Sequence, residues 1–158
     1  MNKEILPPMN KERFKVIPAA YLILIRDNKI LMLRRQNTGF EDGNYSLIAG
    51  HVDENEGPTR AVSREAEEEA GIHILPDNLK LAHVMYRKKP GEERIDFFFI
   101  TNVWEGEPQN LEPEKCDDLS WFPLNRIPQN TIPHVRDVIE NHLVSKRIYS
   151  EYGLDTNA

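Results

Sequence analysis

The sequence predicts an α/β fold in which a mixed β-sheet lies between helical layers. Segments rich in β-branched and aliphatic residues, bounded by turn residues, recur along most of the chain and indicate strands. Two other segments carry apolar residues at helical spacing, one inside the chain and one near its C-terminus. Strands interleaved with helices in this way favour a sheet covered by helices.

The segments before the first helix indicate a hairpin, a loop and a short strand. Asp27-Asn28 is a turn dipeptide between two aliphatic segments, and Gly39 and Gly43 mark the loop that follows. We therefore expect strands at 16–26, 29–35 and 45–49, a turn at 27–28 and a loop at 38–44.

The internal helix is expected to begin at Pro58 and end at Ala70. Proline suits the first turn of a helix, where its missing N–H needs no partner, and Gly71 suits the left-handed residue that ends one. Val62, Ala66 and Ala70 recur every four residues. They give the helix a narrow apolar stripe that can pack on the sheet.

The rest of the chain predicts further strands and a second helix. A Pro-Gly turn joins two of the strands, and the apolar positions 132, 135, 138, 139 and 143 have the spacing of an amphipathic helix. The expected elements are strands at 72–75, 79–88, 94–104 and 119–124, a turn at 89–92, a helix at 132–148 and a loose tail after Tyr149.

Length and composition indicate a single domain. The chain has 158 residues, 39% of them apolar, and we expect one domain over 1–158 with a core at about 16–148 and loose termini. A net charge of −6 without a basic block argues against a nucleic-acid partner. Cys116 is the only cysteine, which excludes an internal disulfide and a cysteine-based zinc site. No membrane or signal segment is recognised, so a cytoplasmic protein is expected.

Three glutamates of the internal helix form the most informative cluster. Glu65, Glu68 and Glu69 are three or four residues apart, so they share one helix face, where like charges repel unless a cation compensates them. Arg64 can pair with Glu56, which leaves the three carboxylates as oxygen ligands. Mg²⁺ prefers oxygen ligands and commonly completes its shell with substrate phosphates. The pattern therefore predicts a magnesium site and a phosphate-containing substrate.

The spacing around these residues matches a family motif. Gly50 is followed after five residues by Glu56, and after seven more by the run Arg64-Glu65-Ala66-x-Glu68-Glu69-x-Gly71-Ile72. This arrangement resembles the Nudix box without a departure, and the chain resembles a MutT-like Nudix hydrolase. The resemblance implies the Nudix fold, an α/β/α sandwich with a mixed sheet, and hydrolysis of a nucleoside diphosphate linked to another group.

The resemblance also implies roles for the motif residues. The carbonyl of its first glycine and its glutamates would hold Mg²⁺ or Mn²⁺, and Glu65 would be either a ligand or the base that accepts a proton from the attacking water. Glu56 and Arg64 would orient the loop and the helix that carry the ligands. The candidate metal ligands are therefore Gly50, Glu65, Glu68 and Glu69, and the three glutamates are the candidate catalytic residues.

Many members of the family recruit one more acidic residue from a later loop. The chain offers four acidic residues shortly before Trp121, and a solvated loop residue is the favoured interpretation for each one taken alone. The sequence does not choose among them. These four candidates are Glu112, Glu114, Asp117 and Asp118.

Residues on either side of the motif are candidates for substrate binding. In related nucleotide hydrolases the base lies between the loop after the first hairpin and the segment after a Trp-Phe strand, and this chain has both landmarks. Aromatic residues there could equally belong to the core and asparagines to plain turns, and either Arg34 or Arg35 could contact phosphate. The candidates are Arg35, Phe40, Tyr45, Ser46, Asn125 and Asn130.

The second landmark departs from one branch of the family. Human 8-oxo-purine hydrolases carry a Trp-Pro-Asp-Asp reader of the base, where this chain has Thr131-Ile132-Pro133-His134-Val135. Marks of other subfamilies are not found at their usual spacing, so we expect a (d)NTP cut to NMP and pyrophosphate. Hydrolysis of ADP-ribose, a dinucleoside polyphosphate or a nucleotide sugar, and a non-catalytic nucleotide-sensing module, are the alternatives. As many similar enzymes do, the chain could form a homodimer.

Overall fold

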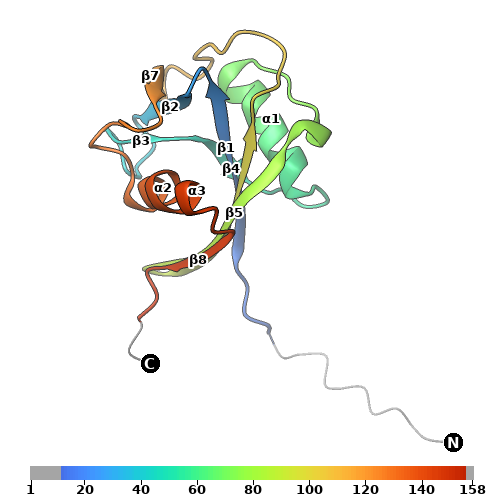
Figure 1. The fold of residues 1–158 in the computed structure, drawn as a ribbon. Helices are drawn as coiled ribbons and strands as arrows, with labels where there is room; N and C mark the ends of the chain where they lie inside the picture. The colour runs from blue at the N-terminus through green and yellow to red at the C-terminus, as the bar shows by residue number, and fades with distance from the viewer. Residues whose placement is uncertain (1–11, 156–158) are drawn as a thin grey trace, which may run out of the picture.

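The structure, a computed structural model, describes residues 12–155 and contains an eight-stranded mixed sheet (Figure 1). The strand order is β3-β2-β1-β6-β5-β8, with β4 also paired to β1 and β7 to β2. The pairs β1–β6 and β5–β8 are parallel, and the other pairs are antiparallel. The elements are β1 Ile17–Arg26, β2 Lys29–Arg35, β3 Tyr45–Ser46, β4 Ile48–His51, α1 Pro58–Ala70, η1 Pro76–Asn78, β5 Lys80–Lys89, β6 Glu92–Thr101, β7 Cys116–Pro123, α2 Pro133–Asp137, η2 Val138–His142, α3 Leu143–Ser145 and β8 Tyr149–Tyr152.

The sheet lies between two helical layers. Side chains alternate along β1, so that Leu22 and Leu24 pack with α1 while Tyr21 and Ile23 pack with the C-terminal helical segment. Each set belongs to its own cluster of buried apolar residues. Figure 1 shows α1 on one side of the central strands and α2 and α3 on the other. The predicted α/β/α sandwich with a mixed sheet is confirmed.

Helix α1 occupies the predicted residues and packs through small side chains. It ends at Gly71, which adopts a left-handed conformation with φ of 65° and closes the last turn through its N–H. The buried face contains three alanines and one valine, so the helix backbone can lie close to the sheet. These residues are Ala61, Val62, Ala66 and Ala70.

The C-terminal helical segment is shorter than predicted. It runs through α2, the π-helical turn η2 and α3, and it ends at Ser145 rather than at Ile148. Lys146 adopts a left-handed φ of 55°, which stops the helical path. The predicted apolar positions do face the sheet: Ile132, Val135, Val138 and Ile139 are buried, and Leu143 is half-buried.

Two predicted strands take a different form. Residues 72–75 are not a strand, and His73 makes only one antiparallel bridge, to Glu105. Ile72 and Ile74 are nevertheless buried, so their alternation indicated burial and not strand pairing. The expected strand at 45–49 divides at Leu47, because β3 pairs with β2 whereas β4 pairs with β1.

The expectation of a loose tail after Tyr149 is wrong for the described residues. That segment forms β8, which pairs in parallel with β5. Ser150 is buried, and its hydroxyl lies 2.7 Å from Nε2 of His83, whose Nδ1 lies 2.6 Å from the carbonyl oxygen of Arg147. These contacts with a strand far away in the sequence hold β8 in place. The remaining ends that were expected to be loose, 1–11 and 156–158, lie outside the described residues.

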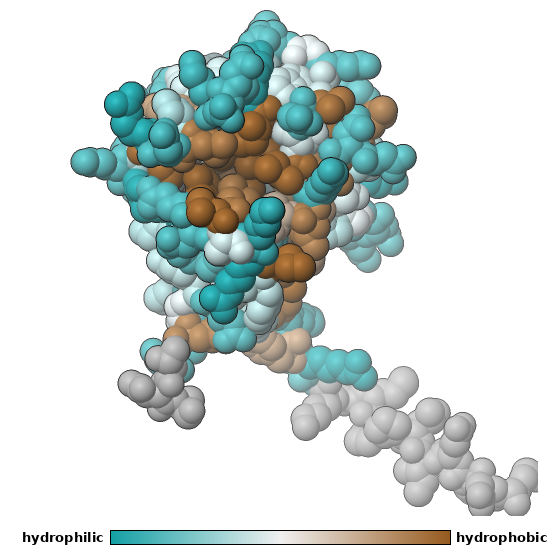
Figure 2. Space-filling model, viewed as in Figure 1, coloured by the Kyte–Doolittle hydropathy of each residue, from teal (hydrophilic) through white to brown (hydrophobic). Residues whose placement is uncertain are grey.

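Within residues 12–155, no helix combines the length and the apolar character needed to cross a membrane. Figure 2 shows hydrophobic side chains gathered on the face above the end of α3. An open hollow of about 420 Å³ lies among apolar residues there, and it shares no residue with the acidic cleft described below. Its apolar lining is Ile25, Ile100, Leu124, Ile139, Leu143 and Val144.

Enlarging the buried face of α1 should destabilise the protein. Ala66 is fully buried, so Ala66→Leu would force α1 away from the sheet at a cost of about 1–3 kcal/mol. The neighbouring Glu67 is exposed, so Glu67→Leu is a size-matched control that should change little. Urea unfolding of both variants measures the difference, and equal free energies of unfolding would contradict the packing described here.

Candidate active site

An acidic cleft of about 510 Å³ lies beside α1. Its walls are the polar face of α1, the end of β2 with the loop after it, and the start of β7 with the loop before it. All three glutamates that the sequence indicated line this cleft, together with one further acid. The acidic and basic side chains of the lining are four carboxyl groups, Glu65, Glu68, Glu69 and Glu112, and two cationic groups, Arg35 and Lys115.

Glu65 packs directly against the backbone of β4 at Gly50. A Cβ atom added to Gly50 would lie 1.9 Å from Oε1 of Glu65, which is closer than any real contact. The Glu65 side chain is only 15% exposed. A side chain at position 50 would therefore displace the Glu65 carboxylate, which occupies the space of a Cβ atom in this structure.

Arg64 connects the loop before α1 to the acidic face of the helix. Its guanidinium donates to Glu56 at 2.7 Å, to Glu65 at 2.8 Å and to the carbonyl oxygen of His51 at 3.1 Å. Glu56 also accepts a hydrogen bond from the backbone N–H of Asp53. The Arg64 and Glu56 pair that the sequence predicted is thus present, and it holds the loop, the end of β4 and α1 together.

Glu69 is the most perturbed carboxyl group of the cleft. Burial, with further contributions from the nearby Glu65 and Glu112, raises the pKa of Glu69 to about 8. One weak compensating contact is the backbone N–H of Ala49, 3.4 Å from Oε2. Burial also raises the pKa of Glu65, although its bond to Arg64 acts in the opposite direction. The cleft is thus lined by four carboxyl groups and two cationic side chains, and burial makes ionisation of Glu65 and Glu69 costly.

This excess of carboxylate suits a hard divalent cation. The four carboxyl groups that line the cleft are the type of oxygen donors that Mg²⁺ and Mn²⁺ prefer, and Gly50 lies next to one of them, Glu65. Among residues 12–155, however, no three His, Cys, Asp or Glu side chains converge closely enough to hold an ion as they stand. Glu65 and Glu68 here accept hydrogen bonds from Arg64 instead. The donor chemistry fits a metal, and a cation would offset the cost of ionising the buried Glu69.

Of the four later acids, Glu112 alone lines the cleft. Asp117 pairs with Arg34 at 2.7 Å. Asp118 accepts hydrogen bonds from the hydroxyl groups of Tyr45 and Ser120. Glu114 is exposed, and only its backbone carbonyl makes a described contact, with Asn37. The structure thus brings Glu112 to the candidate metal ligands and leaves the other three outside.

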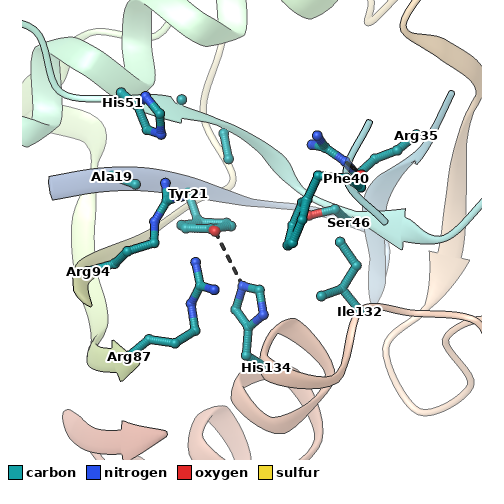
Figure 3. A pocket seen from close by; sticks show the side chains of 12 residues that line it. Ala19, Tyr21, Arg35, Phe40, Ser46, His51, Arg87, Arg94, Ile132 and His134 are labelled. Atoms are coloured by element: carbon teal, nitrogen blue, oxygen red, sulfur yellow. Dashed lines mark hydrogen bonds between the residues drawn. The ribbon is translucent and has the colours of Figure 1, made fainter. Parts of the chain in front are cut away.

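A second cavity, of about 230 Å³, lies on the opposite face of the sheet from α1 (Figure 3). Its lining comes from strands β1 to β6, from the loop after β2 and from the start of α2 with the residue before it. Arg35 lines both the cavity and the acidic cleft. Gly50 lines the cavity and touches Glu65 in the cleft. The two sites therefore adjoin across β4, and we call the cavity the arginine pocket.

The arginine pocket is cationic. Arg35, Arg87 and Arg94 line it, and Asp96, beneath them, is a fully buried carboxylate. His134 adds no charge near neutral pH, because burial and the neighbouring arginines lower its pKa to about 3. The charge of this pocket is thus opposite to that of the cleft.

The predicted substrate residues separate into two groups. Arg35, Phe40 and Ser46 line the arginine pocket (Figure 3). Tyr45 is instead a core residue that packs edge-on against Phe122. Asn130 donates to the carbonyl oxygen of Gly43 and so acts within the loops, and Asn125 lies at the apolar hollow near α3.

Five polar side chains of the arginine pocket were not indicated by the sequence analysis. A signal in the sequence could have marked two of them. Arg87 follows His83 and Met85 at alternate positions of β5. Arg94 precedes Asp96 and Phe98 in the same way on β6. Polar residues on the buried side of a strand indicate a polar site. The five residues are Tyr21, His51, Arg87, Arg94 and His134.

Comparisons with known proteins identify the family. A model of the NUDIX domain matches residues 16–142. A MutT Nudix hydrolase from Burkholderia pseudomallei has a similar structure, with a TM-score of 0.74, 30% identity, and coverage of 80% of this chain and 98% of that one. The chain therefore belongs to the Nudix family. It is a hydrolase that acts on nucleoside diphosphate derivatives, and hydrolases of this family use a divalent metal such as Mg²⁺.

Curated relatives differ in the substrates that their names state. An ADP-ribose pyrophosphatase from Methanocaldococcus jannaschii is 29% identical over 137 residues, 85% of this chain and 79% of that protein. An 8-oxo-dGTP diphosphatase from Escherichia coli is 28% identical over 107 residues, 68% of this chain and 81% of that protein. The chain spans about half the length of the NAD-capped RNA hydrolases NudC that it also matches.

The Arg64 and Glu56 pair should be energetically coupled. Their side chains are 30% and 16% exposed, so we expect a coupling energy of about 1–3 kcal/mol from a double-mutant cycle with Arg64→Met and Glu56→Gln. The helix pair Arg136 and Glu140 is the control, and its cycle should give about 0.3–0.5 kcal/mol. Chemical unfolding measures both cycles. A coupling no larger than that of the control would mean that the pair does not hold the loop to α1.

The metal-free protein should lose stability at high pH because of Glu69. Its pKa is raised from 4.5 to about 8 in the folded state, so protonated Glu69 stabilises the fold fully below pH 4.5, and this contribution is lost as the pH rises through 8. In EDTA, the Tm of the wild type should fall relative to that of Glu69→Gln between about pH 5 and pH 9. Mg²⁺ should reverse the loss in the wild type only. Parallel curves of Tm against pH for the two proteins would show that the pKa of Glu69 is not raised in the folded state.

Proposed function

We propose that this chain is a Mg²⁺-dependent pyrophosphohydrolase that converts a (d)NTP into NMP and pyrophosphate. The observation that carries the proposal is the junction of two unlike sites at β4. The acidic cleft contains the glutamates of the Nudix motif, and the arginine pocket shares Arg35 with it. A substrate could therefore place its phosphates in the cleft while its base and sugar occupy the pocket.

The chemistry follows from the residues of the cleft. Glu65, Glu68, Glu69 and Glu112, with the carbonyl of Gly50, would hold the metal. Mg²⁺, or Mn²⁺ in its place, would neutralise the phosphate oxygens and lower the pKa of a water molecule. Arg35 and Lys115 line the cleft and would bind the phosphates.

In the reaction, the water oxygen forms a bond to phosphorus as the bond between that phosphorus and the bridging oxygen breaks. The water proton passes to a carboxylate, and Glu65 is the candidate base if it does not bind the metal. Its contact with Gly50 and its bond to Arg64 hold the carboxylate in one position at the edge of both sites. Such positioning is what a general base requires.

The size of the arginine pocket favours a mononucleotide. Its volume of about 230 Å³ lies below the usual range of about 300–1,000 Å³ for sites that enclose drug-sized ligands. Phe40 and Ile132 provide apolar surface for one ring system. A single base with its sugar suits this space better than the two nucleosides of a dinucleoside polyphosphate.

ADP-ribose is the second candidate substrate. The similarity to the Methanocaldococcus jannaschii ADP-ribose pyrophosphatase favours it, since the alignment covers 85% of this chain. The two candidates differ in their products, because ADP-ribose gives AMP and ribose phosphate whereas a (d)NTP gives pyrophosphate. Product analysis separates them directly.

Removing one cleft carboxylate should abolish turnover and keep the fold. Glu68 is 53% exposed, so Glu68→Gln should unfold at the wild-type temperature while kcat falls by at least about 100-fold. Glu67→Gln, next to it on the exposed side of α1, is the matched control and should keep wild-type activity. The assay measures release of pyrophosphate and phosphate from dNTPs, oxidised dNTPs, ADP-ribose, dinucleoside polyphosphates and nucleotide sugars with Mg²⁺.

The outcomes of this panel are distinct. Pyrophosphate from dNTPs in the wild type, missing in Glu68→Gln, supports the proposal. Turnover limited to ADP-ribose selects the second candidate. Undiminished activity of Glu68→Gln would overturn the metal assignment. No hydrolysis of any substrate by the wild type, with nucleotide binding intact, would favour a nucleotide-sensing module.

A further inference from the structure

Two buried arginines face each other in the floor of the arginine pocket. Arg87 of β5 and Arg94 of β6 are directly opposite in the antiparallel register. Their side chains are only 6% and 12% exposed. Like charges in directly opposite positions destabilise a sheet, and burial of a charge adds a further cost. An arrangement of this kind needs a compensating partner.

Two carboxylates compensate this pair, and one of them, Asp96, is shared by both arginines. Nε of Arg87 donates to Oδ2 of Asp96 at 2.7 Å, whereas Nε of Arg94 lies 3.7 Å from Oδ1, too far for a hydrogen bond. Nε of Arg94 and Oδ1 of Asp96 are both buried without a hydrogen-bond partner. Glu92 accepts one further bond from Arg94. The pair is therefore incompletely satisfied by the protein.

The two guanidinium groups rise side by side toward Tyr21 and the cavity (Figure 3). Arg87 uses its Nε for Asp96 and also interacts with the Tyr21 hydroxyl, and Arg94 uses Nη1 for Glu92, so the remaining N–H groups are the donors that the two side chains can offer to the cavity they line. Guanidinium groups are donors only. This wall of the pocket therefore suits a ligand edge that carries hydrogen-bond acceptors.

The other walls favour a flat ring over a phosphate group. Phe40 and Ile132 face the cavity, as Figure 3 shows, and an aromatic face stacks on a planar base. A phosphate would leave this apolar surface without a matching partner. Together, the stacking surface and the donor edge describe a nucleobase whose exposed edge carries adjacent acceptors.

We propose that Arg87 and Arg94 select substrates by their base, favouring guanine and cytosine over adenine and thymine. Guanine carries N7 beside O6, and cytosine carries N3 beside O2, so each offers two neighbouring acceptors. Adenine places its amino group beside N7, and thymine has an N–H between its oxygens. The inference rests on the proposed function, since it concerns the base of the same (d)NTP.

The test compares the four dNTPs as substrates and the four dNMPs as ligands. The monophosphates report on the pocket without hydrolysis. We expect kcat/KM for dGTP and dCTP to exceed that for dATP and dTTP by about tenfold or more, with dGMP and dCMP binding more tightly in the same order. Equal values in both assays, or a preference for adenine, would overturn the inference.

Variants of Arg94 test whether this side chain determines the preference for the base. Arg87 is unsuitable, because its loss would leave the buried Asp96 unpaired. Arg94→Met should reduce the guanine-to-adenine ratio to about one, and Arg94→Lys should reduce it as well, because lysine keeps the charge and loses the planar fork. Arg126→Met, on the exposed surface, is the control and should keep the ratio.

The outcomes separate the two proposals. Binding of dGMP and dCMP with the expected preference, together with no hydrolysis of any nucleotide, would reject the hydrolase and support base selection. Hydrolysis whose base ratio is the same in Arg94→Met would support the hydrolase and overturn base selection. A wild-type guanine-to-adenine ratio in Arg94→Lys would also overturn base selection, because the positive charge alone would then be enough to produce the preference.

Discussion

The close contact between α1 and β4 is the constraint on which the rest of the site depends. The buried stripe of α1 consists largely of alanine, so the helix lies close enough to the sheet for the Glu65 carboxylate to rest on Gly50. Arg64 then holds the preceding loop to the same helix through Glu56. A bulkier residue on the buried stripe of α1 would move the acidic face of the helix away from β4, and a side chain at position 50 would displace the Glu65 carboxylate.

This contact places two opposite electrostatic environments next to each other. An acidic cleft alone would repel a nucleotide. Burial also makes the negative charge of Glu69 costly, since the pKa of this group rises to about 8. A divalent cation would reduce the repulsion of the nucleotide and would offset the cost of ionising Glu69. Across β4, Arg87 and Arg94 share one carboxylate and present donors to the cavity. In the proposed function, the two ends of a metal-bound nucleotide would meet surfaces of different character, which would orient the molecule.

Local signals in the sequence predicted most elements correctly. The bounds of α1 were predictable because proline and glycine at its ends act on their own turns, and the hairpin turn was predictable because Asp27 and Asn28 adopt the left-handed conformation that such residues tolerate. Errors occurred where pairing involves distant residues. The segment after Tyr149 becomes a strand only because β5 offers it a parallel partner, and residues 72–75 lack such a partner beyond a single bridge.

For the site, the sequence by itself determined that three glutamates share one face of α1, because the helical repeat places residues three and four apart on the same side. Only the tertiary structure decided that Glu112 lines the cleft while the other nearby acids do not, that Tyr45 is a core residue, and that Arg87 and Arg94 form the floor of the arginine pocket. The physical reason is that a helix face depends on local geometry. The choice among loop acids, and the meeting of side chains from different strands, depend on how distant segments pack.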